Sequence, residues 1–239
     1  WVWSIGAGFT EVDGKDYRKE FSNWWKDKWK TIKYPSRGGV FDYYVDIKNS
    51  KLEEWSKMLT KEFKVDTEKP ISNFTVPTTD TVSFQYLLKQ FISVGHAPLL
   101  VGNAGCGKTQ ISKGLLNDLT NEGDNYNFQI TNFNFYTDSW LLQTILEQNL
   151  EKRAGKTFAP PGKAKLIYFI DDLNMPKLDE YNTQTAIALL RQHEDYGHWY
   201  DRTKMQLKDI INTQKFACMN PTAGSFFVNP RLQRHFWLL

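Results

Sequence analysis

The sequence predicts an α/β fold, in which helices cover both faces of a parallel sheet. From about residue 80 onward, short apolar runs alternate with segments of helical periodicity, which is typical of such a sheet. The run Leu166–Ile170 (LIYFI) is apolar at every position, as in a strand buried on both faces. Two carboxylates, Asp171 and Asp172, follow it directly. They would lie at the edge of the sheet where ligands of such folds bind.

The first 60 residues form a different kind of segment, rich in aromatic side chains. Lys15–Lys33 has helical periodicity, with aromatic residues at i, i+3, i+4 and i+8 counted from Phe21. The run from Pro35 to Gly39 ends this helix, and Val40–Ile47 predicts a short extended piece. We interpret residues 1–60 as an aromatic-rich N-terminal extension that docks its own aromatic face or packs on a neighbour. Residues 61–80 are polar, contain prolines and are interpreted as a linker.

Residues 81–239 carry the alternating pattern and are interpreted as the main α/β domain. The predicted helices are Thr81–Val94, Lys108–Leu119, Ser139–Gln148 and Thr183–His193. The predicted strands are Ala97–Val101, Phe128–Phe135, Leu166–Ile170, Lys215–Met219 and one that begins at Phe236 and reaches Leu239. Strands that alternate with helices in this way indicate βαβ units.

Composition excludes several classes of protein. Apolar residues make up 41% and charged residues 24% of the 239 positions, which is ordinary for a globular domain with a buried core. The net charge of +3 is too small to indicate a nucleic-acid partner. The lysines of Lys15–Lys33 are interleaved with acids, as on the solvated face of a helix. No apolar run approaches the ~20 residues of a membrane span.

Two features bear on the setting of the protein. Its two cysteines, Cys106 and Cys218, do not suggest a disulfide framework and indicate a reducing cytosolic compartment. The chain opens with WVWSIGAGF, without an initiator methionine or a signal peptide. We therefore expect it to be an excerpt of a longer protein.

Gly102–Thr109 (GNAGCGKT) matches the phosphate-binding loop G-x-x-x-x-G-K-[ST]. Its glycines allow a tight turn whose backbone N–H groups point at phosphate oxygens, and the following helix adds the positive end of its dipole. Lys108 can reach the β- and γ-phosphates, and the Thr109 hydroxyl can ligate Mg²⁺. The loop follows an apolar strand and opens a helix, as this mechanism requires, so a chance match is a poor explanation. The predicted nucleotide-binding residues are Gly102, Asn103, Ala104, Gly105, Cys106, Gly107, Lys108 and Thr109.

The acidic strand end gains its meaning from this loop. A strand that ends in Asp-Asp is by itself equally consistent with a simple turn. Here it lies about 60 residues after the phosphate loop, with one predicted strand between. In that setting Asp171 is the expected Mg²⁺ ligand, directly or through water, and Asp172 is the expected residue that orients and activates the attacking water.

Three further polar residues are candidates for the site. Asn220 ends the strand Lys215–Met219 and could hold the attacking water or a γ-phosphate oxygen, although Pro221 after it also suits a simple Asn-Pro turn. Arg231 and Arg234 lie in NPRLQRHF. An arginine supplied across a module boundary can stabilise the charge of phosphoryl transfer. Helix-end arginines that bridge acids are an equally good interpretation of their spacing.

The order of these parts resembles the large subdomain of an AAA+ ATPase. The segments FIDDLNMPKLDEYNTQTAIALLRQHEDYGHWYDR and FACMNPTAGSFFVNPRLQRHF look like the third AAA+ module of axonemal dynein heavy chains, most of all the outer-arm, beta type. FSNWWKDKWKTIKYPSRGGVFDYYVD looks like the segment that joins the second module to the third. The resemblance covers nearly the whole chain. DDLNMP and MNPTAGSF are typical of dyneins rather than of phosphate-loop proteins in general.

The resemblance implies a five-stranded parallel sheet in the order 5-1-4-3-2, sandwiched by helices. It also implies that the module is one of six in a ring within one polypeptide. Val76–Asp80 would line the adenine pocket, and Gly197–Lys208 would be an insert before the sensor strand. Arg234 matches the arginine-finger position and would face the nucleotide of the preceding module. The small helical subdomain would follow Leu239, where the sequence stops.

The implied setting is that of the family. ATP or ADP and Mg²⁺ would be the cofactors, and neighbouring AAA+ modules and other dynein heavy, intermediate and light chains the partners. Microtubules would be contacted only through a distant coiled-coil stalk, and neither nucleic acid nor membrane is an expected partner. The whole chain would be a minus-end-directed motor that drives ciliary and flagellar beating, located in the cytoplasm, the cytoskeleton and the axoneme.

One position departs from the family pattern. AAA+ modules that hydrolyse well end the acidic strand with Asp-Glu, whereas this chain has Asp171-Asp172. Aspartate is shorter by about 1.5 Å, one carbon–carbon bond, and a displacement of about 1 Å can cost on the order of 100-fold in rate. We therefore expect ATP binding with slow or regulatory hydrolysis. The alternative is a structural nucleotide with negligible turnover. A DNA-handling AAA+ protein would predict a basic stripe, which is not evident here.

Overall fold

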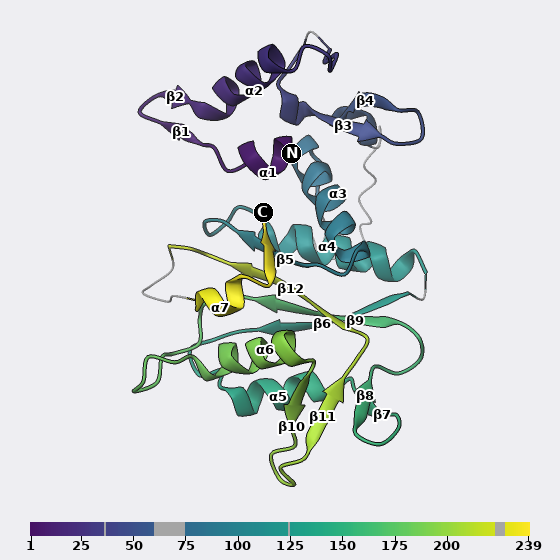
Figure 1. Cartoon of the computed structure of the whole chain (residues 1–239), viewed down its shortest axis with the longest axis vertical. Helices are drawn as coiled ribbons and strands as arrows, with labels where there is room; N and C mark the ends of the chain where they lie inside the picture. Colours follow the sequence, from purple (N-terminus) through teal and green to yellow (C-terminus); the bar gives the residue numbers. More distant parts are fainter. Residues whose placement is uncertain (36, 60–74, 124, 223–227) are drawn as a thin grey trace. The chain divides into compact units, whose positions relative to one another are not determined.

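The computed structural model describes residues 1–35, 37–59, 75–123, 125–222 and 228–239 (Figure 1). The expected linker, residues 61–80, lies outside the described residues up to position 74. The chain divides into two compact units, residues 1–84 with Leu239 and residues 85–238. Among the described residues, no helix is long and apolar enough to cross a bilayer.

The N-terminal unit is built from short elements. Helix α1 (Val2–Gly6) precedes the small hairpin of β1 (Glu11–Val12) and β2 (Lys15–Asp16), and helix α2 (Tyr17–Lys28) follows. Helix α2 begins later than the pattern predicts because the Asp16 side chain caps it, accepting a hydrogen bond from the Lys19 amide at 3.0 Å. The antiparallel pair β3 (Tyr43–Asp46) and β4 (Lys51–Glu54) follows, with a 3₁₀ turn at Trp55–Met58.

The aromatic residues of this unit pack on one another, in agreement with the expectation that the segment docks its own aromatic face. Phe21, Trp25, Val40 and Phe41 form its buried cluster. The rings of Trp25 and Trp29 stack with centroids 4.3 Å apart. The predicted extended piece Val40–Ile47 is wrong in its first half, since Val40–Asp42 is a 3₁₀ turn. The Asp42 carboxylate accepts a hydrogen bond from the Gly39 amide at 2.6 Å, which closes this turn.

The second unit contains the predicted parallel sheet. Its five strands lie in the order β13-β5-β12-β9-β6, and every neighbouring pair is parallel. Numbered along the chain, this is the expected order 5-1-4-3-2. The strands are β5 (Ala97–Val101), β6 (Tyr126–Asn132), β9 (Lys165–Asp171), β12 (Thr213–Met219) and β13 (Phe236–Leu238). Each predicted strand exists, although β6 begins two residues earlier and ends three residues earlier than its pattern suggested.

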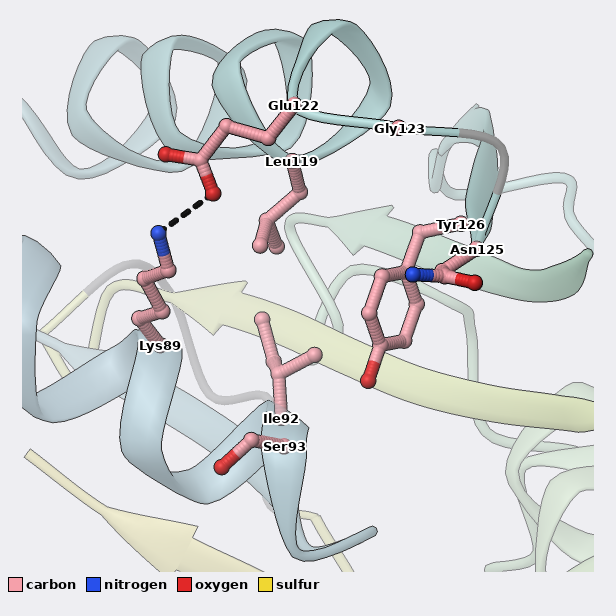
Figure 2. Close-up of a pocket in the computed structure, with 8 residues that line it drawn as sticks. All are labelled: Lys89, Ile92, Ser93, Leu119, Glu122, Gly123, Asn125 and Tyr126. Carbon is pink, nitrogen blue, oxygen red and sulfur yellow. Dashed lines mark hydrogen bonds and ion pairs between the residues drawn. The ribbon is translucent and has the colours of Figure 1, made fainter.

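Helices α3 (Thr79–Ser93) and α4 (Lys108–Asn121) include the residues of one small pocket. Figure 2 shows Lys89, Ile92 and Ser93 of α3 opposite Leu119, Glu122 and Tyr126, around a cavity of about 170 Å³. Lys89 and Glu122 form an ion pair at its mouth. The pocket lies at the carboxyl end of α4, a helix of 14 residues and therefore about 21 Å long. It is remote from the phosphate loop, which opens the other end of that helix.

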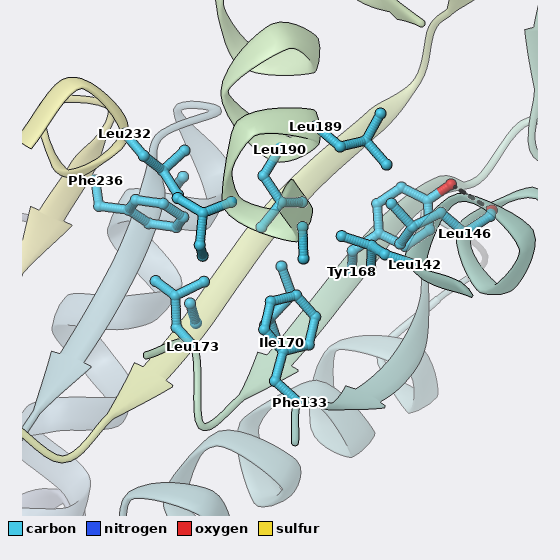
Figure 3. Close-up of a cluster of buried hydrophobic side chains, with 14 of the residues drawn as sticks. Phe133, Leu142, Leu146, Tyr168, Ile170, Leu173, Leu189, Leu190, Leu232 and Phe236 are labelled. Atoms are coloured by element: carbon cyan, nitrogen blue, oxygen red, sulfur yellow. Dashed lines mark hydrogen bonds between the residues drawn. The ribbon is translucent and has the colours of Figure 1, made fainter. Parts of the chain in front are cut away.

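Helices α5 (Ser139–Glu147), α6 (Thr185–Tyr196) and α7 (Pro230–Gln233) share the main hydrophobic core with the sheet. Figure 3 shows Leu142 and Leu146 of α5 and Leu190 of α6 gathered with Tyr168 and Ile170 of β9. Alternate β9 residues Ile167 and Phe169 are equally buried. They point to the opposite face because side chains alternate along a strand. The apolar run LIYFI is thus explained by burial on both sides.

A second sheet, which the sequence pattern did not predict, lies beside α5. Its strands β7 (Glu151–Lys152), β8 (Thr157–Ala159), β10 (His198–Tyr200) and β11 (Leu207–Ile210) have the order β10-β11-β8-β7. The insert expected at Gly197–Lys208 is therefore a hairpin. Glu147 of α5 anchors it, accepting hydrogen bonds from Trp199 Nε1 at 2.7 Å and Lys208 Nζ at 2.9 Å.

A buried lysine ties α6 to the sheet. Lys215 of β12 is only 2% exposed, and its ammonium contacts the Glu194 carboxylate and His193 Nδ1, the latter at 2.7 Å. Burial lowers the pKa of both Lys215 and His193, and the neighbouring Lys215 charge adds to the effect on His193, whose pKa falls to about 2. His193 is therefore neutral in the fold, and its Nδ1 accepts a hydrogen bond from Lys215 Nζ.

This cluster predicts a loss of stability in acid. The unfolded chain protonates His193 below its ordinary pKa of 6.5, whereas the fold resists protonation, so this stability is present above that pH and falls as pH decreases. The free energy of unfolding is expected to fall by roughly 1.4 kcal/mol for each pH unit below the ordinary pKa of histidine. His193→Asn keeps a hydrogen-bond acceptor and cannot be protonated. Urea unfolding between pH 6.5 and 4.5 should show a shallower pH slope for this variant, with His96→Asn as control. Equal slopes for the three proteins would contradict the prediction.

Candidate nucleotide-binding site

The strand register brings the predicted residues to one edge of the sheet. Met219 of β12 pairs with Val101 of β5, and Ala217 pairs with Ile170 of β9. Because the strands are parallel and in register, the residues that follow them emerge side by side. Gly102, Asp171 and Asn220 therefore lie at the same edge. This is the edge where doubly wound α/β folds bind their ligands.

The loop between β5 and α4 has the backbone conformation that a phosphate cradle needs. Gly105 and Gly107 have φ of +82° and +86°, in the left-handed region that side chains with a Cβ rarely adopt. Gly107 is the N-cap of α4, so the helix and its unpaired N–H groups start at Lys108. The Lys108 ammonium donates to the carbonyls of Gly102 at 2.7 Å and Asn103 at 2.8 Å. These bonds hold the first residues of the loop close to the Lys108 ammonium group.

Two oxygen ligands suited to a divalent cation meet beside this loop. Thr109 Oγ1 donates to Asp171 Oδ2 at 2.8 Å, although 62 residues separate them in the chain. Mg²⁺ commonly uses one or two protein oxygens and takes its remaining ligands from phosphates and water. Among the residues that the structure describes, no group of three His, Cys, Asp or Glu side chains could hold a metal. A hydroxyl and a single carboxylate therefore fit Mg²⁺ held together with a nucleotide.

Asp172 occupies a tight turn after β9. Its φ is +57°, a left-handed conformation in which Asp and Asn are enriched among residues with a side chain. Its carbonyl accepts a hydrogen bond from the Met175 amide at 3.0 Å. Partial burial raises the pKa of Asp172, and the adjacent Asp171 charge raises it further while Lys108 opposes them. The turn that the Asp-Asp pair suggested is thus present beside the phosphate loop.

Asn220 lies at the expected edge and also forms the Asn-Pro turn that was the alternative interpretation. Its Oδ1 accepts hydrogen bonds from the Thr222 amide at 3.1 Å and the Thr222 hydroxyl at 2.9 Å. These bonds occupy the carboxamide oxygen and leave the amide nitrogen as the donor that a ligand would meet. The Thr222 hydroxyl also lies 3.5 Å from Asn103 Oδ1 in the phosphate loop.

Sequence reasoning missed Asn174. This residue is 2% exposed, and its Nδ2 donates to the backbone carbonyl of Asn220 at 2.8 Å. It therefore fixes the end of β12 to the turn that follows β9. Its place within DDLNMP was the available signal, but nothing in that run indicates a contact with a strand 46 residues away.

The two arginines near the end of the chain have different surroundings. Arg231 is the second residue of the short helix α7, and its amide donates a hydrogen bond at 2.9 Å to the side chain of the Asn229 cap. The Arg234 guanidinium forms an ion pair with Asp195 of α6, while its side chain remains 61% exposed. The acid-bridging interpretation of Arg234 therefore describes its contact. Its exposure leaves it available to a group outside the chain.

Two other expectations concern the cysteines and the residues named for the adenine pocket. Cys106 is exposed in the loop and Cys218 is buried in β12, and both are free. Burial raises the pKa of the Cys218 thiol to about 12, so it is an inert core residue. Of the residues expected near adenine, Thr79 and Asp80 line a pocket of about 330 Å³ within the N-terminal unit, together with Trp3, Phe41 and Trp55.

The sheet order and the loop geometry define the class as an AAA+ P-loop module. Residues 63–239 match the family described as the P-loop containing dynein motor region, and residues 1–57 match the dynein heavy chain AAA lid domain. The chain belongs to the dynein heavy chain family, whose members are AAA+ ATPase motors.

Individual relatives agree with this assignment. The chain is 47% identical over 235 residues to dynein axonemal heavy chain 9 of Homo sapiens, and 46% identical over 239 residues to the dynein alpha chain of the flagellar outer arm of Chlamydomonas reinhardtii. It is 44% identical over 236 residues to the flagellar outer-arm dynein beta chain of the same alga. These matches cover 98%, 100% and 98% of the chain, which spans about 5% of the length of each relative. The resemblance to axonemal heavy chains is confirmed.

The loop geometry predicts the effect of replacing its lysine. Lys108→Ala should retain the fold and weaken nucleotide binding at this site by at least about 100-fold, since the two charge-assisted hydrogen bonds that Lys108 would make to the β- and γ-phosphates, at ~1.5 kcal/mol or more each, are lost. Lys113→Ala removes the same charge from the same helix, outside the loop, and is the matched control. A fluorescent-nucleotide titration measures both. Wild-type affinity in the Lys108 variant would contradict the prediction.

Proposed function

We propose that this chain is the third AAA+ module of an axonemal dynein heavy chain, preceded by the segment that joins it to the second module. The phosphate loop with Thr109 hydrogen-bonded to Asp171 supports the nucleotide-binding part of this proposal most directly. In this proposal the module binds ATP or ADP with Mg²⁺ and regulates the motor cycle. The whole chain is an ATP-driven, minus-end-directed microtubule motor that powers ciliary and flagellar beating.

Each site residue has a role in this proposal. The backbone amides of Gly102–Thr109 bind the phosphates, and Lys108 contacts the β- and γ-phosphates. Thr109 and Asp171 would hold the cation, which would supply positive charge beside the phosphates. Asp172 accepts a proton from the attacking water and orients it, and Asn220 holds that water or a γ-phosphate oxygen. Arg234 acts in trans, toward the nucleotide of the preceding module.

The partners follow from the same proposal. Neighbouring AAA+ modules of one six-module ring contact this one, and dynein heavy, intermediate and light chains assemble with the whole protein. Microtubules are bound through a stalk elsewhere in the chain. The relatives that are named axonemal, ciliary or flagellar support a location in the axoneme.

The rate of hydrolysis separates two forms of the proposal. The shorter side chain of Asp172 favours slow, regulatory turnover, because its carboxylate stands about 1.5 Å further from the water than that of glutamate. The alternative is a structural nucleotide that is never hydrolysed.

Asp172→Glu in the full-length motor tests this choice. If the short side chain of Asp172 limits the rate, turnover assigned to this site should rise by about 10- to 100-fold in the variant. The left-handed backbone at position 172 favours Asp over Glu, so thermal unfolding of the variant should be followed alongside. Single-turnover release of phosphate measures the rate, with the phosphate-loop lysines of the other modules replaced. No increase in a folded variant would support the structural nucleotide.

A further inference from the structure

The candidate arginine finger is held by one carboxylate. Asp195 lies in the last turn of α6 (Thr185–Tyr196). Its Oδ1 accepts a hydrogen bond from Arg234 Nη2 at 2.5 Å and lies 2.8 Å from His235 Nε2. Arg191, one turn earlier on the same helix, places its Nε 3.8 Å from Oδ2. Three basic side chains therefore converge on one acid.

The position of Asp195 is electrostatically unfavourable unless a cation lies beside it. The carboxyl end of a helix carries partial negative charge, so a carboxylate in the last turn is destabilising. The hydrogen bond from Arg234 is the largest effect that lowers the pKa of Asp195, with a further contribution from His235. Arg234 thus supplies a positive charge that favours the ionised form of Asp195.

Asp195 is nearly buried whereas Arg234 is exposed, which indicates that the acid holds the arginine in place and not the reverse. The Asp195 side chain is 12% exposed, whereas that of Arg234 is 61% exposed. Asp195 is fixed to the body of the unit by Arg191 and by His235, whose side chain is 21% exposed. Because Asp195 is held in place and bonded to the exposed Arg234, it limits where the guanidinium of Arg234 can move. Arg234 Nε also donates to His235 Nε2 at 3.3 Å, and the guanidinium donors outside these two contacts remain for a second acidic partner.

We propose that Asp195 is the positioning residue for Arg234, orienting its guanidinium for the nucleotide phosphates of the neighbouring module. This inference rests on the trans role of Arg234 proposed above. An arginine finger stabilises the transition state only when it is correctly placed, and a long side chain at the surface has many rotamers to lose. The carboxylate lowers that entropic cost by restricting the arginine before the nucleotide site forms.

The test is a double-mutant cycle in the full-length heavy chain, with ATP turnover read at the preceding module while the phosphate-loop lysines of the other modules are replaced. Asp195→Asn should lower that turnover by about tenfold, less than Arg234→Ala does. It should have no further effect when Arg234 is already alanine. Asp195→Glu should restore part of the rate. Asp209→Asn breaks an ion pair with Lys156 elsewhere on this unit and serves as the matched control.

Two readouts keep the outcomes distinct. Thermal unfolding and nucleotide affinity at this chain's own site should be unchanged by Asp195→Asn, which a merely structural role would not predict. If Arg234→Ala lowers turnover and Asp195→Asn does not, the positioning role is overturned while the role of Arg234 stands. An equal effect of Asp195→Asn with and without Arg234 also overturns it. If Arg234→Ala has no effect, the trans role falls, and this inference with it.

Discussion

The parallel hydrogen-bonding register of β5, β12 and β9 is the constraint on which the rest of the site depends. It aligns Val101 with Met219 and Ala217 with Ile170, so three chain segments leave the sheet together. A slip of one residue would turn every side chain of a strand to the other face and bury carboxylates among leucines. The cost of burying those carboxylates therefore favours the observed register. The fixed register in turn brings Thr109 to Asp171.

The central sheet and the phosphate loop could be predicted from the sequence because each leaves a strong local signal. A strand buried on both faces is apolar at every position, as in Leu166–Ile170, and the loop needs glycine at fixed spacing. The contact between Thr109 and Asp171 spans 62 residues, yet it was predictable, because one chemical task requires both oxygens. The strand order came from the resemblance to a family, and β-strand periodicity alone would not have given it.

The remaining features depend on contacts between distant side chains that no local pattern records. Strand β7 is only Glu151–Lys152 and is fully exposed, so it has no apolar alternation to detect. Hydrogen bonds from the hairpin to Glu147 hold the second sheet against α5. Val40–Asp42 turns because Asp42 reaches back to the Gly39 amide, although its apolar residues suit an extended strand. Asn174 likewise acts through a backbone carbonyl 46 residues away.

One turn of α6 connects two parts of the proposed chemistry. The consecutive residues His193 and Glu194 contact Lys215 on β12, and the strand that carries Lys215 ends at Asn220. The next residue, Asp195, contacts Arg234. A packed interior transmits small displacements rather than absorbing them, so a shift of this helix end moves both the strand of the candidate sensor and the candidate finger. The contact between α6 and β12 is rigid, because the buried Lys215 is not hydrated and depends on its two α6 partners. The end of α6 therefore contacts both the strand that leads to the candidate sensor and the candidate finger.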